Sequence, residues 1–447
     1  SNVGGTVSLS SMSILNITSS TDATDNLQTM SGVDAIQGTG TIGALSLTGV
    51  KISNPSDMAI KGTGTWTGLT INNSLIEKSN RYGVANRGDS NNEGMVVISG
   101  LTGTASITNS KFDQGATLVD LMTSTSGHLD VTMTNNIFSN SYKGFNGGVG
   151  GVYQVGGYGV RLITQGSASM TAIIGDVNET NAALGNLFLN DTYSVFVGHL
   201  NGTDTGLIKA LLSENTFQVT NHLSPTGAPG FTIPNGTVLL APLGVGNMDA
   251  TVSNNTFDQL VDAAGLEGSL SVAAQGGTNN QVRVTGNNFI NPWNRPIELR
   301  SNNGAVLTAL VSGNTYSTGT AGGAATDSTT STGSYNAHRF WTLNNSTLNL
   351  TWTNETGATN SFFNGALIQA ANAGDTLNVF MNNLAVPTGY TFSNAGTLNL
   401  FRNGSISGTI QGILQDNNVT GGGGSTATNP PNVSSIGTIT FSNTAVI

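Results

Sequence analysis

Short β-type runs of apolar residues, separated by a polar corner, recur along most of the chain. In each copy the run leads into a one- or two-residue corner centred on Asn, and an aromatic or aliphatic residue follows. Most neighbouring copies start 21 to 40 residues apart. The clearest copies lie at 107–112, 133–138, 212–217, 252–257, 284–289 and 311–316, with a Thr-Leu-Asn variant at 347–352, 376–381 and 397–402. Such a repeat predicts stacked units, each a core turn with insertions of variable length.

The Asn corner predicts a tight bend between two strands. Asn tolerates the left-handed region of backbone conformation and can hydrogen-bond within its own turn. If the units stack, the corner side chains lie about 4.8 Å apart, so their amides can bond one another as a ladder. The aromatic or aliphatic residue after each corner is then expected to stack inside, as the core.

The same pattern does not suit helices. β-branched residues are dense, Gly interrupts nearly every block of ten residues, and no stretch holds a 3.6-residue period over three turns. The sequence therefore predicts an all-β fold: a right-handed parallel β-helix (solenoid) with Asn-rich corners and a few side insertions. At roughly 25 residues per turn, the solenoid is expected to have about 17 turns, stacked at the usual strand spacing. A β-sandwich is the competing fold, because many short strands with turn signals also fit it.

The repeat also sets the expected domain boundaries. Residues 1–420 are predicted to form one solenoid, with insertions near 141–166, 221–236 and 318–336. The Gly- and Pro-rich segment 421–432 is expected to be a linker. Residues 433–447 alternate like one more strand and are expected to form a terminal strand or cap.

Composition narrows the classes of partner. Charged residues make up 9% of the chain, against about 25% in a typical soluble domain. The 14 basic and 24 acidic residues give a net charge of −10 with no basic cluster in the sequence, so nucleic acid is not an expected partner. The chain has no Cys, which removes disulfides and thiolate metal sites. No apolar run approaches 18 residues, so membrane insertion by this segment is not expected.

The repeated Val-Ser-Asn-Asn-Thr-Phe phrase resembles the parallel β-helix repeats of the pectate-lyase-like superfamily. The lack of Cys, the acidic balance and the wealth of Gly, Asn, Thr and Ser are similar to those of the passenger domains of bacterial autotransporter adhesins. The likeness covers about residues 40 to 415 and is one of repeat style. It implies an exported, extracellular protein of a bacterial cell surface. No cofactor is expected from the sequence.

That superfamily includes polysaccharide lyases and hydrolases, which use clustered carboxylates. Here the 17 Asp and 7 Glu are scattered, with no Asp-x-Asp pair. Asp113, Asp120 and Asp130 could still share one face of a coil, so an enzyme stays an alternative, although we assign no catalytic residue. The four His, at positions 128, 199, 222 and 338, are too dispersed to predict a metal site.

Three short segments are candidate binding sites. Arg87-Gly88-Asp89, followed by Ser, resembles the integrin-recognition motif, in which Asp completes a metal site on the receptor. A plain β-turn is the alternative. The other two segments combine scarce residue types, Trp with Arg, which suit sugar binding because rings stack on sugars. They centre on Trp293 and Arg295, with Glu298 and Arg300 behind, and on Arg339 and Trp341. In these segments Trp could instead plug the core.

The expected function is adhesion. A stiff rod would display its lateral faces to host or matrix glycans or glycoproteins, to an integrin-like receptor or to identical rods, and repeated weak contacts would add avidity. The first alternative is a polysaccharide lyase or hydrolase on the same fold. The second is a structural stalk or a self-assembling surface fibre.

Overall fold

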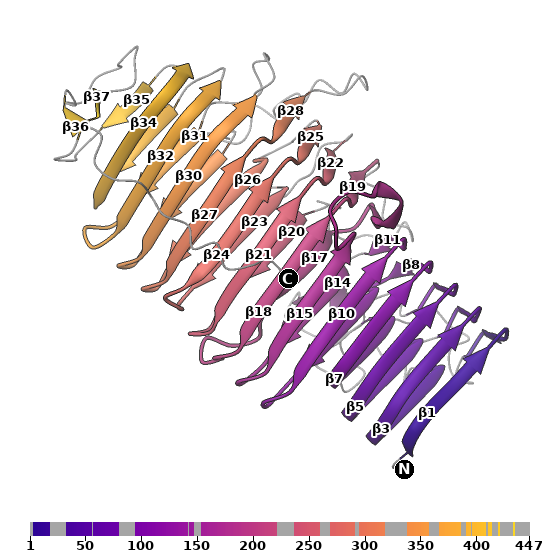
Figure 1. Cartoon of the computed structure of the whole chain (residues 1–447). Helices are drawn as coiled ribbons and strands as arrows, with labels where there is room; N and C mark the ends of the chain where they lie inside the picture. Colours follow the sequence, from indigo (N-terminus) through magenta and orange to yellow (C-terminus); the bar gives the residue numbers. More distant parts are fainter. Residues whose placement is uncertain are drawn as a thin grey trace.

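The computed structural model describes residues 3–17, 33–55, 57–79, 94–141, 143–146, 153–220, 237–259, 269–290, 295–317, 338–356, 366–385, 390–394, 396–407, 410–413, 419–420 and 432–433. Within these ranges 33 strands belong to one sheet, and its strands pair in parallel. The strands form three rows, which we name A, B and C. Figure 1 shows them stacked from β1 at the N-terminal end, in indigo, to β34 in yellow.

Row A contains the longest series of strands. Its members are β1 (Val3–Ser10), β3 (Ile36–Thr48), β5 (Ile60–Asn72), β7 (Val96–Thr108), β10 (His128–Thr134), β15 (Ser169–Gly175), β18 (Leu207–Ser213), β21 (Asn247–Ser253), β24 (Asn280–Thr285), β27 (Val306–Ser312), β30 (Thr347–Thr356), β32 (Thr376–Ala385) and β34 (Thr397–Ser407).

Row B follows row A in each turn of the coil. Its members are β2 (Ser13–Leu15), β4 (Lys51–Ser53), β6 (Leu75–Glu77), β8 (Lys111–Gly115), β11 (Ile137–Ser141), β16 (Leu187–Leu189), β19 (Thr216–Val219), β22 (Thr256–Gln259), β25 (Asn288–Ile290) and β28 (Thr315–Ser317). After β28 the row is continued by the ends of β30, β32 and β34.

Row C leads from row B into the next turn. It begins with the first halves of β3, β5 and β7, which bend from row C into row A. Its other members are β9 (Val119–Thr123), β14 (Tyr158–Thr164), β17 (Tyr193–His199), β20 (Thr237–Ala241), β23 (Leu270–Gln275), β26 (Ile297–Asn302), β29 (His338–Thr342), β31 (Ala366–Ala370), β33 (Tyr390–Asn394) and β35 (Ile410–Ile413).

These parallel rows confirm the prediction of an all-β repeat fold consistent with a parallel β-helix. The sandwich alternative is wrong, because packed sandwich sheets consist of antiparallel strands. The right hand of the coil stays a prediction. Row A has thirteen strands rather than about 17, which gives a stack about 60 Å long. The estimate was too high because many turns exceed 25 residues; 50 residues separate Asn136 from its partner Asn186 in the next turn.

Outside the large sheet, the described chain forms three short features. β12 (Lys143–Asn146) and β13 (Tyr153–Gly156) make an antiparallel hairpin between rows B and C. It lies in the segment 141–166, whose later part, β14, belongs to row C. The 3₁₀ helix η1 (Ala182–Leu184) precedes β16, and β36 (Val419–Thr420) pairs antiparallel with β37 (Asn432–Val433). Residues 221–236, 318–336, 421–431 and 434–447 lie outside the described residues.

The corner between rows A and B has the predicted backbone conformation. In most turns its first residue adopts a positive φ, of 48° at Asn73, 51° at Asn109, 52° at Asn135 and 54° at Asn254. The second corner residue points inward and is buried. Six such Asn side chains, one per turn, form a continuous internal ladder, which we call the Asn ladder: Asn136, Asn186, Asn215, Asn255, Asn287 and Asn314.

The four amides between the end members Asn136 and Asn314 of the Asn ladder are satisfied in the same way. In Asn255, the backbone N and the side-chain Nδ2 both donate to Oδ1 of Asn287, each at 3.0 Å. The same Nδ2 also donates to the carbonyl of Leu212 in the preceding turn, at 2.9 Å. Oδ1 of Asn255 accepts from N and Nδ2 of Asn215, at 2.9 and 3.0 Å. A buried amide has two donors and two acceptor positions, and here all four are used.

The aromatic residue after each corner stacks in the core, as predicted. Ring centroids of successive turns lie 4.7 to 5.3 Å apart, close to the strand spacing. The stack consists of Phe112, Phe138, Phe188, Phe217, Phe257, Phe289 and Tyr316. A column of buried amides, the Asn ladder, therefore runs beside a column of aromatic rings, and both columns keep the turns in register.

Both columns end at one carboxyl group, that of Glu355 on β30. Its Oε1 accepts from N and Nδ2 of Asn314, at 3.1 and 2.8 Å, and its Oε2 accepts from the hydroxyl of Tyr316. Glu355 is 3% exposed, and burial raises the pKa of its carboxyl to about 7 despite these donors. The Asn ladder thus ends on an acid that titrates near neutral pH.

Candidate functional site

The structure describes three of the seven predicted binding residues. Arg295, Arg339 and Trp341 lie within the described ranges. The other four, Arg87, Gly88, Asp89 and Trp293, lie outside the described residues, so the integrin-type motif stays a prediction.

The two Trp/Arg segments, whose named residues are at least 39 positions apart in the sequence, meet on row C. β26 and β29 are neighbouring strands, and their register places Glu298 beside Arg339 and Arg300 beside Trp341. Side chains alternate in and out along each strand. Ile297, Leu299 and Phe340 therefore enter the core, while Arg300, Arg339 and Trp341 alternate with them on the outer side.

The outward side chains contact one another closely. The indole Nε1 of Trp341 donates to Oε1 of Glu298 at 3.0 Å. Arg295 Nη1 lies 2.7 Å from Oε2 of the same carboxylate, and Arg339 Nη1 lies 4.0 Å from its Oε1. The guanidinium carbon of Arg339 is 3.6 Å from the ring centre of Trp341, and that of Arg300 is 5.7 Å away. We name these five residues the Arg–Trp platform.

The charges of the platform do not balance. Three guanidinium groups, of Arg295, Arg300 and Arg339, accompany the single carboxylate of Glu298. Burial, together with the positive charges of Arg295 and Arg300, lowers the pKa of Arg339, although Glu298 acts in the opposite direction. The side chains are only 22% exposed in Arg339, 14% in Arg295 and 12% in Glu298. Positive charge is therefore concentrated in a partly desolvated place, where it interacts strongly with anions.

Trp341 is part of the outer surface of row C. It is half-buried and stacks on Arg339, whereas Trp66 and Trp352 are the buried indoles of the described core, 2% and 0% exposed. In the next turn Gln369 of β31 lies in register with Trp341 and is also half-buried. The sequence contained no signal for Gln369, because its place beside Trp341 depends on how the chain between them is divided into turns.

The three Asp that could have shared a face do not. Asp113 is on β8 of row B, Asp120 on β9 of row C and Asp130 on β10 of row A. Asp120 is paired with Arg161 at 3.1 Å and Asp130 with His128 at 2.9 Å. The idea of one catalytic face from these residues is wrong, because consecutive strands of one turn lie on different rows.

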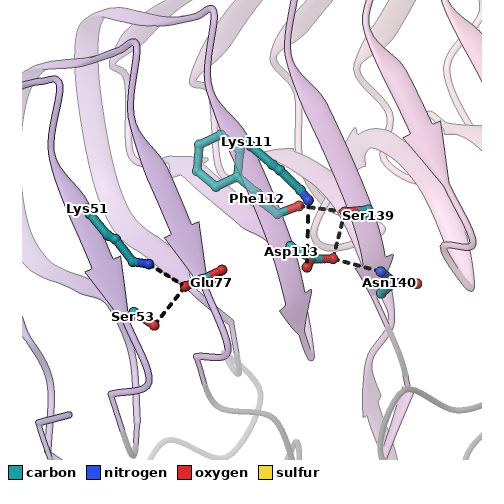
Figure 2. A network of polar contacts seen from close by, with 8 residues as sticks. All are labelled: Lys51, Ser53, Glu77, Lys111, Phe112, Asp113, Ser139 and Asn140. Atoms are coloured by element: carbon teal, nitrogen blue, oxygen red, sulfur yellow. Dashed lines mark hydrogen bonds and ion pairs between the residues drawn. The ribbon is translucent and has the colours of Figure 1, made fainter. Parts of the chain in front are cut away.

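Asp113 belongs instead to a polar strip along row B. Figure 2 shows it accepting hydrogen bonds from Ser139 Oγ and Asn140 Nδ2, both at 2.7 Å, with Lys111 at 3.9 Å. In the preceding turns Glu77 accepts from Ser53 Oγ at 2.9 Å and pairs with Lys51 Nζ at 3.0 Å. Each carboxylate has its own neighbours, as expected of a surface ladder that holds adjacent turns together.

Among the described residues, no group of three or more His, Cys, Asp or Glu side chains could hold a metal ion. His128 is exposed, and His199 and His338 are buried in different turns; His222 lies outside the described residues. The part of the chain that the structure describes also contains no helix of the length and apolar character that crossing a membrane requires.

Comparison with known protein families, curated proteins and solved structures gives no match to this chain. Function is therefore argued from the geometry of the rod and of the Arg–Trp platform.

Proposed function

We propose that this chain is an extracellular adhesive rod, a right-handed β-helix of the autotransporter-passenger style, which binds glycans of host or matrix at the Arg–Trp platform. The observation that carries the proposal is the stacking of Arg339 on Trp341, at 3.6 Å, on the outside of row C. Aromatic rings stack on the apolar faces of sugars, and flanking polar groups bind the hydroxyls. A rigid support is what such a site needs, because little ordering is left to binding.

The polysaccharide lyase or hydrolase and the structural stalk are the alternatives to adhesion. An enzyme of this fold needs carboxylates that converge on one cleft, and Asp113, Asp120 and Asp130 supply none together. A stalk needs no partly desolvated Arg and Trp on its lateral surface, since such groups are costly to hold there. The platform therefore favours binding over both alternatives.

The test is binding of the purified chain to a panel of immobilised polysaccharides and glycosaminoglycans, with Trp341→Ala as the variant. We expect the wild-type chain to bind at least one glycan, and the variant to bind it about tenfold more weakly, because one stacked ring contributes on the order of 1.4 kcal/mol. Phe196→Ala is the matched control: Phe196 is also half-buried and aromatic on row C, in an earlier turn. Its affinity should match that of the wild type.

The same incubations separate the alternatives. Chromatography of each soluble glycan after contact with the chain should show unchanged length. Shortened glycans would instead establish an enzyme. Absence of binding to every glycan would contradict the proposal and favour a stalk or a protein ligand at the Arg87–Asp89 motif.

A further inference from the structure

Two guanidinium groups of the Arg–Trp platform lack the partners that buried Arg side chains usually have. Arg161, Arg283 and Arg295 each donate hydrogen bonds to a carboxylate. Arg300 and Arg339, in contrast, make no hydrogen bond to a described residue, and their Nε atoms are buried. Arg339 reaches Glu298 only at 4.0 Å, beyond hydrogen-bond distance.

This arrangement is costly unless something compensates it. Each guanidinium carries five N–H donors, and holding a partly buried guanidinium without hydrogen-bond acceptors is unfavourable. Glu298 supplies only part of the compensation, because its single negative charge accompanies three guanidinium groups and its oxygens accept from Arg295 and Trp341. The platform therefore has donors and positive charge left over for oxygens that come from outside the described chain.

We infer that the Arg–Trp platform is a site for an oxyanion, a carboxylate or sulfate group carried by a sugar unit. Arg300 and Arg339 bind the oxyanion through their guanidinium donors, which match the geometry of such groups. Trp341 holds Arg339 in place, and the sugar contacts the part of the ring that Arg339 does not cover. Glu298 fixes Arg295 and Trp341 by accepting from both. The inference rests on the proposed function and adds the chemical class of the ligand.

The charge of the whole chain makes this inference specific to one place. The net charge is −10, so a polyanion is repelled by the molecule at long range. Binding of an anionic glycan therefore needs a local site such as the platform, where positive groups exceed negative ones. Basic proteins attract polyanions non-specifically, which complicates such experiments. This acidic chain repels them at long range, so that complication does not arise.

The experiment compares dextran, dextran sulfate and hyaluronan as ligands of the full chain. The first two share a backbone and differ in sulfate, while hyaluronan carries carboxylates alone. We expect dextran sulfate or hyaluronan to bind at least tenfold more tightly than dextran, since charged hydrogen bonds are strong enough for that difference. Whichever of the two binds identifies the group. Inorganic sulfate or glucuronate should compete with the glycan that binds, and added NaCl should weaken the binding of that glycan.

The double variant Arg300→Gln/Arg339→Gln should lose tenfold or more of that affinity. Arg283→Gln is the matched control, because Arg283 lies on row A and pairs with Asp249; it should bind within about twofold of the wild type, as an off-site charge does. Circular dichroism checks that both variants fold. If the double variant does not fold, competition by sulfate or glucuronate on the wild-type chain still decides the question.

Equal binding of dextran, dextran sulfate and hyaluronan, or a double variant that binds like Arg283→Gln, would overturn the inference. If the chain binds neutral glycans and this binding depends on Trp341, the inference of an oxyanion site is overturned but the proposed adhesion is not. If no glycan binds at all, the proposed function fails as well.

Discussion

Replacing Asn255 with Asp should destabilise the fold by about 3 to 5 kcal/mol, although the two side chains have nearly the same shape. The carboxyl can still accept from Asn215, but its second oxygen replaces the Nδ2 that donates to Leu212 O and Asn287 Oδ1. The carbonyl oxygen of Leu212 and Oδ1 of Asn287 would then face a third acceptor, the new carboxyl oxygen, with no hydrogen atom between them. Because a protonated carboxyl regains one donor, the loss should be smaller in acid than at neutral pH.

Urea unfolding and hydrogen exchange of strands β18, β21 and β24 measure this effect. The matched control is Asn73→Asp, the same exchange at an exposed corner whose φ of 48° suits Asp. That variant should change the free energy of unfolding by less than about 0.5 kcal/mol, as surface substitutions usually do. Similar losses in both variants would show that the Asn ladder does not stabilise the coil.

The second large effect concerns Glu355, at the end of the Asn ladder. The pKa of its carboxyl is about 7 in the folded chain, against 4.5 as the ordinary value. Between these values the folded state keeps a proton that the unfolded state releases, so this group lowers stability as pH rises. The stability that Glu355 contributes is fully present below pH 4.5. About 3 kcal/mol of the free energy of unfolding is lost by pH 7 and above.

A neighbouring group acts in the opposite direction. Burial lowers the pKa of His338 to about 3 from 6.5, so the unfolded state binds the extra proton and stability rises with pH up to about 6.5. The two slopes oppose each other between pH 4.5 and 6.5. The effect of Glu355 is therefore isolated by subtracting the stability of the wild type from that of Glu355→Gln at each pH.

We expect this difference to shift in favour of Glu355→Gln by about 3 kcal/mol between pH 4.5 and 8. Gln keeps an oxygen for Asn314 and has no charge to bury. Glu214→Gln, at a half-exposed corner outside the Asn ladder, is the control for the exchange itself and should shift less. A difference that stays constant with pH would mean that Glu355 is not held protonated by burial.

Local sequence explains why the fold could be predicted in outline. The phrase Thr134-Asn135-Asn136 needs one residue with positive φ and one buried amide, and Asn supplies both in consecutive positions. Phe138 then follows at the distance that places its ring inside. Glu355 was missed although Asn354-Glu355 occupies the same two corner positions, because a carboxyl there does not look like a ladder residue until its donors are seen.

The candidate site could be predicted only in pieces. Arg295 and Trp341 stand out as scarce residues, but nothing in the sequence tells that their segments are adjacent turns, because loops of unequal length separate the turns. The same uncertainty made Asp113 and Asp130 look like neighbours. Pairing between turns is decided by which strands complete the three rows, a long-range property that short motifs do not encode.

The unequal turns also govern how such a rod would respond to mechanical force. Pulling on one end peels away one turn at a time, since each turn is bonded mainly to its two neighbours. The 26 residues from Ser110 to Asn136 would release at most about 90 Å of chain, and the 50 residues from Asn136 to Asn186 about 170 Å. The rod would therefore lengthen in steps of different size and would dissipate tension that otherwise acts on the proposed contact with a glycan.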